Sequence, residues 1–286
     1  MKKIILIITV LFTVNIIAQD SKKNSTKDTI EVKKDKGLPL KAERKININT
    51  DEGTWMSLDI SPDGKTIVFD MLGDLYLLPI EGGNAKRITE GLAFDSNPKF
   101  SPDGEDLLFV SDRTGGPNVW IINLATKDST QVTKGDTYNI QAAEWTPDGN
   151  YIISSRGNRN VKLNMHHRDG GKGTILIKTP ANLKTVEPAF GKDERYIWYS
   201  KRTGSWQYNA KFPQYQLAKY DRETGKSKTM TSRYGSAFSP TLSSNGKWLV
   251  YGTRWNDKTG LIARELKTGS EKWLAYPIQK DDQESQ

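Results

Sequence analysis

The sequence predicts an all-β fold, a β-propeller of four-stranded antiparallel blades. The first observation is a tetrapeptide, Ser/Thr-Pro-Asp-Gly, at residues 61–64, 101–104 and 146–149, each time between two short apolar runs. The second is that no segment after the first 18 residues shows a convincing 3.6-residue hydrophobic period, which argues against helices. Together they indicate a repeated unit of short strands joined by tight turns.

Each residue of the tetrapeptide favours a hairpin turn for its own physical reason. Proline fixes φ near the value that the second position of a tight turn requires. Aspartate hydrogen-bonds to nearby backbone groups, and glycine accepts a positive φ without steric cost. The apolar runs on either side are therefore predicted to be paired strands.

With the turn as anchor, five repeats can be aligned, which begin at Ser61, Ser101, Thr146, Gly191 and Ser243. The fourth copy has lost the proline and the glycine, and the fifth has Asn-Gly in place of Asp-Gly, yet both keep the strand that follows. We expect four strands in each repeat, with blades near residues 54–89, 96–133, 140–178, 186–231 and 238–276. A β-sandwich is the main alternative, but it would not carry the same turn in every four-strand unit.

The N-terminus has the layout of a secretory signal peptide over residues 1–18. Lys2 and Lys3 precede an apolar run that ends at Ala18, a small residue suited to a cleavage point. A membrane anchor is the alternative, but the run is short for a span. A polar, basic linker is expected over residues 19–44, with no stable membrane span after cleavage. The sequence therefore predicts a periplasmic or secreted protein.

The net charge of +8 does not indicate a nucleic-acid partner. Residues 19–50 hold nine Lys/Arg and five Asp/Glu, or +4, and residues 51–286 hold 31 and 29, or only +2. A nucleic-acid reader would cluster basic residues on its folded face, so we expect no nucleic acid as partner. The chain has no cysteine, which excludes disulfides and thiol catalysis.

Residues 45–286 are expected to form the propeller, as an incomplete ring of five blades. Residues 42–50, AERKININT, lie ahead of the first blade and read as a strand in the fourth position of a blade. Because a terminal strand commonly completes the blade at the other terminus, Lys45–Asn49 would complete a blade whose other strands follow residue 286. The alternative is a five-bladed ring with a disordered N-terminal extension.

No catalytic, metal or cofactor site is predicted in this chain. Two histidines that share a metal from one strand must lie two residues apart, on one face. The two histidines here, His166 and His167, are adjacent and should point to opposite faces. A Gly-x-Ser-x-Gly elbow and a Walker-type phosphate loop are both absent. Whether the protein is an enzyme stays open, and hydrolase activity is expected only from a further C-terminal domain.

Two features are candidate partner contacts. An arginine follows the second strand in four repeats, as Arg113, Arg156, Arg202 and Arg254. These guanidinium groups could bind carboxylates of a partner from one rim, or each could tie its blade to an acidic residue such as Asp112 or Asp70. The long insertion of the fourth repeat carries Trp206 and Tyr208, which could contact a partner or pack over the neighbouring blade.

The stretch SNPKFSPDGEDLLFVSDRTGGPNVWIINL, residues 96–124, resembles the repeat of TolB-like, WD-like propellers of bacterial envelopes. The same repeat type occurs in tricorn-like and prolyl-oligopeptidase-like proteases, and the resemblance covers about residues 45–276. Residues 50–104 are most similar to the N-terminal propeller of secreted bacterial amidohydrolases, including the segments GTWMSLD and AFDSNP.

The resemblance implies a non-catalytic module that scaffolds a downstream metal-dependent catalytic domain or gates access of its substrate. One alternative is a stand-alone periplasmic module that binds envelope proteins, as TolB-like propellers do. Another is the propeller of a serine peptidase. All three imply a partner protein or partner domain and no cofactor in this chain.

Overall fold

The computed structural model describes residues 46–54, 56–204, 214–256 and 258–278. Contacts divide the chain into two compact units, residues 1–50 and residues 51–286. The expected signal peptide and linker, residues 1–18 and 19–44, lie outside the described residues. Every regular element in the described part is a strand. No helix that could cross a membrane occurs there.

The second unit consists of five four-stranded antiparallel sheets, each made of consecutive strands. Blade 1 contains β1 (Leu58–Ile60), β2 (Thr66–Met71), β3 (Asp74–Pro79) and β4 (Lys86–Arg87). Blade 2 contains β5 (Asp95–Phe100), β6 (Asp106–Ser111), β7 (Asn118–Asn123) and β8 (Ser129–Gln131). Blade 3 contains β9 (Asn139–Trp145), β10 (Tyr151–Gly157), β11 (Lys162–His167) and β12 (Gly170–Ile175). Blade 4 contains β13 (Thr185–Phe190), β14 (Tyr196–Arg202), β15 (Tyr215–Asp221) and β16 (Ser227–Thr229). Blade 5 contains β17 (Phe238–Leu242), β18 (Trp248–Trp255), β19 (Lys258–Glu265) and β20 (Glu271–Ala275).

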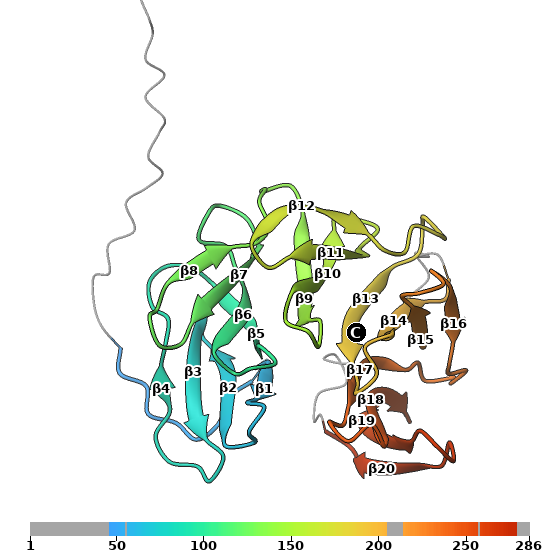
Figure 1. The fold of residues 1–286 in the computed structure, drawn as a ribbon. Helices are drawn as coiled ribbons and strands as arrows, with labels where there is room; N and C mark the ends of the chain where they lie inside the picture. The colour runs from blue at the N-terminus through green and yellow to red at the C-terminus, as the bar shows by residue number, and fades with distance from the viewer. Residues whose placement is uncertain (1–45, 55, 205–213, 257, 279–286) are drawn as a thin grey trace, which may run out of the picture. The chain divides into compact units, whose positions relative to one another are not determined.

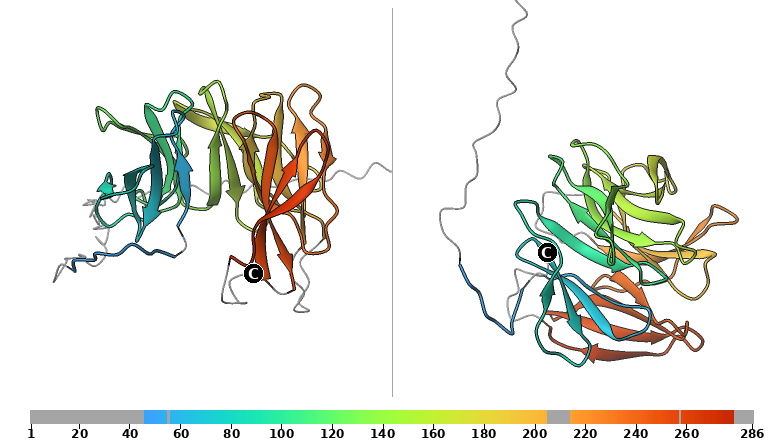
Figure 2. Two further views of the ribbon diagram at one scale, coloured as in Figure 1. Left: turned by 90° about the horizontal axis from the view of Figure 1, so that it is seen from below. Right: turned by 60° about the vertical axis from the view of Figure 1, so that its left-hand side comes forward.

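The blades follow one another around a common axis, from β1–β4 to β17–β20 (Figure 1). Two further views show the same succession (Figure 2). The prediction of an all-β propeller with five blades of four antiparallel strands is therefore confirmed.

The Ser/Thr-Pro-Asp-Gly tetrapeptides form closed, hydrogen-bonded turns between the first and second strands. In blade 2, the Ser101 hydroxyl donates to Asp103 Oδ1 at 2.6 Å and accepts from the N–H of Asp106 at 2.9 Å. Asp103 Oδ1 also accepts from the N–H of Glu105 at 3.0 Å, and Gly104 has a φ of 78°. These bonds, first of all the one from Ser101, hold the pKa of Asp103 below its usual value.

Turns of consecutive blades lie against each other. A Cβ placed on Gly104 would lie 3.4 Å from Pro62, and one placed on Gly149 would lie 3.7 Å from Pro102. The proline of one turn therefore contacts the glycine of the next. Near-constant spacing along the chain thus places equivalent turns side by side around the axis.

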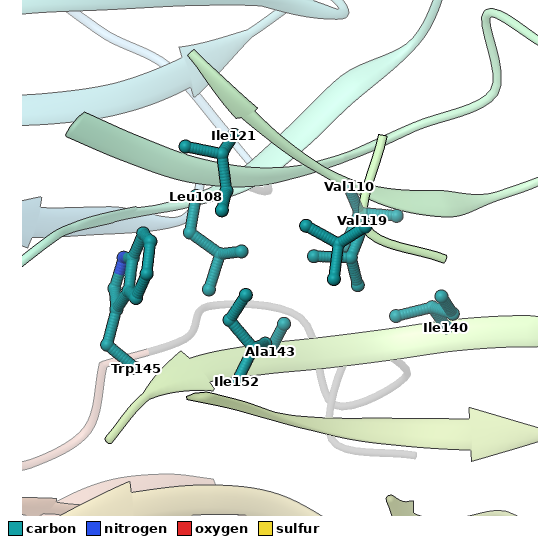
Figure 3. Close-up of a cluster of buried hydrophobic side chains, with 9 residues drawn as sticks. Leu108, Val110, Val119, Ile121, Ile140, Ala143, Trp145 and Ile152 are labelled. Atoms are coloured by element: carbon teal, nitrogen blue, oxygen red, sulfur yellow. The ribbon is translucent and has the colours of Figure 1, made fainter. Parts of the chain in front are cut away.

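Four apolar clusters fill the four interfaces between consecutive blades, and each cluster draws residues from two blades. Between blades 2 and 3, Leu108 and Val119 face Ala143 and Ile152 (Figure 3). None of these four side chains is more than 3% exposed. Because a fully buried large aliphatic or aromatic side chain contributes about 1.5–3 kcal/mol, these clusters are the main apolar support of the fold.

A polar contact from a bulge in the first strand joins consecutive blades at three interfaces. The N–H of Asn97 in β5 donates to Asp70 Oδ2 in β2 at 2.8 Å, and Asn97 has a positive φ of 54° at a register shift. Two later interfaces repeat the bond at 2.9 and 3.0 Å, from Glu187 to Ser155 Oγ and from Ser239 to Ser200 Oγ. The bulge therefore turns an N–H away from its own sheet and toward the preceding blade.

The outer face of blade 1 is apolar and only partly covered. The strand register places Leu58, Phe69 and Tyr76 in one row, with Ile60 on the same face. Leu58 is 56% exposed and Ile60 49%, whereas Val68 on the opposite face is fully buried. Among the described residues, extensive packing joins each blade to the next, but no such packing joins blade 5 to blade 1.

Residues 46–50 do not form the strand that was expected over residues 42–50. Ile46 and Ile48 are 68% and 58% exposed, and residues 42–45 lie outside the described residues. A strand forms only where it lies beside a sheet edge. Each of the five described sheets consists of four consecutive strands, and none of these strands comes from residues 46–50.

The fourth strand of blade 3 begins at Gly170, directly after the turn at Asp169. Gly170, Gly171 and Gly173 all have positive φ values, of 99°, 116° and 71°. These left-handed residues let the chain reverse directly after Asp169 and pair with β11 through a register shift.

Removal of one hydroxyl tests the turn. Ser101→Ala removes the bond to Asp103 and leaves the N–H of Asp106 without its side-chain acceptor. We expect a loss of about 1–2 kcal/mol in the free energy of unfolding, measured in urea. The control is Ser129→Ala, at an exposed position of β8, which should change it by less than about 0.5 kcal/mol. Equal effects of the two substitutions would contradict this account of the turn.

Candidate functional site

The four arginines singled out in the sequence lie at or just after the end of the second strand of blades 2–5. Arg113 is neutralised within its own blade. Its guanidinium donates to both carboxylate oxygens of Asp95 and to Ser111 Oγ, each at 2.9 Å. The acidic residue that it meets is therefore Asp95 on β5, and not Asp70 or Asp112. This contact ties β5 to β6 and occupies the side chain that a partner would need.

The other three arginines differ from Arg113 and from one another. Arg156 lies over the ring of Tyr138, 4.5 Å from its centre. Arg202 is 8% exposed, and its buried Nε has no hydrogen-bond partner. Arg254 lies over the ring of Phe238 at 5.3 Å, and burial lowers its pKa. The four side chains thus have four environments, and of these only that of Arg156 belongs to the cavity described below.

The aromatic candidates Trp206 and Tyr208 lie outside the described residues, within segment 205–213. The strands on either side, β14 and β15, pair as far as Arg202 and Tyr215. A partner contact through these aromatic residues stays a prediction.

The two histidines point to opposite faces of β11, as the sequence predicted. His166 is 1% exposed, with Nε2 3.0 Å from Ser154 Oγ and with no hydrogen-bond partner at Nδ1. Burial, and to a smaller extent the charge of Arg156, lower the pKa of His166 to about 4. His167 is exposed, beside Asp169. In the described part of the chain, no three His, Asp or Glu side chains are grouped so that they could hold a metal ion.

A row of charged side chains crosses the first strands of blades 1, 2 and 3. Lys99 Nζ lies 3.8 Å from Asp59 Oδ1 and 3.7 Å from Glu144 Oε2. Burial raises the pKa of Glu144 to about 7, because it disfavours the carboxylate more than Lys99 stabilises it. The attraction of Glu144 in turn raises the pKa of Lys99. The row joins three blades electrostatically, and it contains no hydroxyl or thiol that could act as a nucleophile.

A cavity of about 730 Å³ is formed by blade 3 and the link that leads into it from blade 2. Its walls come from the link between β8 and β9, the loop between β10 and β11, and strands β11 and β12. Four cationic side chains line it, from Lys134, Arg156, Lys162 and Lys172. Three amides lie among them, from Asn158, Asn160 and Asn164. The lining includes no Asp or Glu, so the cavity is strongly basic.

Lys162 is the most buried of these cations, at 8% exposure. Its Nζ donates to the carbonyl of Pro180 at 2.6 Å and to the carbonyl of Leu183. Desolvation lowers its pKa. Carbonyl dipoles therefore hold this ammonium in place of a carboxylate.

Sequence reasoning found Arg156 and missed the three lysines of the cavity. Lys134, Lys162 and Lys172 lie 38 positions apart at most in the sequence, but each belongs to a different segment of blade 3 or of its entry link. Neither the composition of the chain nor a sequence motif indicates that these three lysines lie together. The signal that was present is a break in the repeat alignment at Ser154, where the other four blades have an aromatic residue.

Comparisons with known proteins agree with the geometry. A family model for the TolB beta propeller domain matches residues 38–211. The chain is 28% identical over 155 residues to dipeptidyl-peptidase 5 of Porphyromonas gingivalis. The aligned region covers 46% of this chain and 22% of that protein. It is also 28% identical over 167 residues to the Tol-Pal system protein TolB of Wolinella succinogenes. This alignment covers 55% of this chain and 39% of that protein.

Among solved structures, TolB from Acinetobacter baumannii has a TM-score of 0.60 at 23% identity, over 76% of this chain and 53% of that one. This likeness shows the shared propeller fold. The chain spans well under half the length of the curated relatives that it matches.

The buried histidine gives a pH-dependent prediction. A folded-state pKa of about 4, below the ordinary 6.5, means that the contribution of His166 to stability is present above pH 6.5 and is lost as the pH falls toward 4. The full effect of such a shift is on the order of 3 kcal/mol. Comparing His166→Asn with the unchanged chain in urea at pH 7.5 and pH 4.5, we expect the stability advantage of histidine to shrink at the lower pH. The control His167→Asn, at the exposed neighbour, should show no such change. A pH-independent difference for His166→Asn would contradict the assignment.

Proposed function

Because the chain belongs to the TolB-type β-propeller family, we propose that it is a non-catalytic module that works by contact with another protein domain. The observation that carries the proposal is the outer face of blade 1, where Leu58 and Ile60 are about half exposed, at 56% and 49%. An apolar sheet face of this kind is a surface for a protein contact.

The chemistry of this face indicates what covers it. The rings of Phe69 and Tyr76 are stacked 5.5 Å apart and occupy the same sheet positions as Phe109 and Trp120 in blade 2. In blade 2 that face packs on the apolar face of blade 1, through residues such as Val68. The expected occupant of the blade 1 face is therefore a twisted, apolar β-sheet face of another domain.

We place the module in a larger hydrolase, where it scaffolds the catalytic domain or gates its substrate. The similarity of residues 50–104 to propellers of secreted amidohydrolases supports a metal-dependent amidohydrolase. The relation to dipeptidyl-peptidase 5 supports a second candidate, the propeller of a serine peptidase. The relation to the Tol-Pal system protein TolB supports a third, a propeller that binds envelope proteins without a catalytic domain.

The proposed location is the periplasm or the cell exterior. The arrangement of Lys2, Lys3 and the apolar run up to Ala18 supports export through a signal peptide. The relation to TolB is consistent with a protein of the bacterial envelope.

An assay of the purified chain tests the non-catalytic part of the proposal. Residues 19–286 are incubated with chromogenic amide and dipeptide substrates, with and without added zinc. We expect no turnover above that of a heat-denatured sample, because the hydroxyl–imidazole pair of Ser154 and His166 is buried away from substrate, and the described residues contain no group of three metal-binding side chains. Zinc-dependent turnover that survives repeated purification would contradict the proposal.

Inhibitors separate the three larger contexts when the protein is isolated from its natural source. Hydrolase activity that a chelator abolishes supports the amidohydrolase. Activity that a fluorophosphonate abolishes supports the serine peptidase. A protein without either activity that copurifies in a stoichiometric envelope complex supports the third candidate.

A further inference from the structure

One position of the repeat breaks its pattern in blade 3 alone. The residue eight places after each turn anchor lies on the second strand, on the face toward the preceding blade. In four blades it is aromatic, as Phe69, Phe109, Tyr199 and Tyr251. In blade 3 it is Ser154, which is fully buried. The blade with the cavity is therefore the blade that lacks the aromatic ring.

The residue opposite Ser154 on the neighbouring strand is also small and polar where blade 2 has an aromatic ring. Ser154 pairs with Asn164, whereas the equivalent pair in blade 2 is Phe109 with Trp120. Two small polar side chains thus replace two large rings at the interface with the preceding blade. Asn164 lines the cavity, whereas Ser154 is buried against the ring of His166, with Oγ 3.0 Å from Nε2.

The next pair along the strands adds charge. Arg156 pairs with Lys162 on β10 and β11, where blade 2 has Ser111 and Asn118. Lys134 and Lys172 approach from the entry link and from β12. Loss of the rings and gain of cations therefore coincide on one face of one blade.

These cations lack carboxylate partners within the part of the chain that the structure describes. Elsewhere, basic residues at blade edges are paired, such as Arg168 with Asp106 and Arg195 with Asp221. None of the four cations of the cavity forms an ion pair with a carboxylate of the described residues. Like charges around a partly enclosed space repel, and an anion bound between them would relieve that repulsion.

From this arrangement, we infer that the cavity of blade 3 and its entry link binds a small organic polyanion, a molecule with two or more carboxylate or phosphate groups. Four cations from four segments match more than one anionic group. A guanidinium suits the bidentate recognition of a carboxylate or a phosphate, and ammonium groups act as point charges.

Size and polarity limit the ligand further. A volume of about 730 Å³ falls within the range of small-molecule sites, about 300–1,000 Å³. The amides of Asn158, Asn160 and Asn164 can donate to and accept from hydroxyl or carbonyl groups between the anionic ends. The exposed ring of Tyr138, held under Arg156, offers one apolar wall. The site goes beyond the proposed module function and does not depend on the identity of the partner domain.

Calorimetric titration of the full chain tests the inference. The probes are citrate for carboxylates, pyrophosphate for phosphates and sucrose as a neutral molecule of similar size. We expect binding of citrate, of pyrophosphate or of both, with an affinity that falls as sodium chloride is raised, and no binding of sucrose. Stronger binding of citrate assigns the site to carboxylates, and stronger binding of pyrophosphate assigns it to phosphates.

Substitutions locate the binding. Arg156→Gln and Lys172→Gln should each weaken binding about tenfold, the loss expected for one charge-assisted contact. If Arg156→Gln alters the unfolding midpoint, Lys134→Gln replaces it as the test of the site, because Lys134 lines the cavity from an exposed position. The matched control is Lys267→Gln, an exposed lysine after β19 in blade 5 that does not line the cavity, and it should leave the affinity unchanged.

Two results would overturn the inference. One is the absence of heat and of any shift in unfolding midpoint with both anions at low salt. The other is binding that Lys267→Gln weakens as much as Lys172→Gln does, because that result would indicate general attraction to a basic protein.

Discussion

The structure depends on one constraint: a four-stranded sheet with apolar residues on both faces cannot cover itself. Each blade therefore needs a neighbour on each side, and the four apolar clusters lie at the four interfaces where this need is met. The aspartate turns and the bulges act within this constraint. They set where each strand begins and turn one N–H toward the preceding blade, as in the bond from Asn97 to Asp70. Blade 1 shows what happens where this need is not met. Its outer face has the apolar composition of an interface, yet Leu58 on that face is 56% exposed.

Much of the fold could be predicted from the sequence, because the chemistry that determines it is local. Ser101, Asp103 and Gly104 close their turn with each other and with their immediate neighbours, so the motif located the strands of blades 1–3. In blades 4 and 5, where the motif is altered, the strand that follows it kept the alignment. The strand expected over residues 42–50 shows the limit of this reasoning. Ile46 and Ile48 alternate as a strand would, but alternation alone does not bring a segment beside a sheet edge with which it could pair.

The site was harder to predict, because its residues meet through packing. Asp95 lies 18 positions before Arg113 and reaches it only through the pairing of β5 with β6. Blade 3 has Ser154 where the other four blades have an aromatic residue, and this difference becomes visible only when the repeats are aligned in register. The lysines of the cavity gain their meaning from the same geometry, since Lys162 faces the cavity only because it stands opposite Arg156 across two strands.

Amide hydrogen exchange of the purified chain under native conditions tests the central claim most directly, that each sheet is held by coverage of both its faces. The strands to compare are β2 and β10, which are both second strands and both paired on two sides, but which differ in coverage. The account predicts that amides of Tyr151–Gly157, in a blade covered on both faces, exchange only through global unfolding, and that amides of Thr66–Met71 exchange faster through local opening. Equal protection of the two strands would contradict the account.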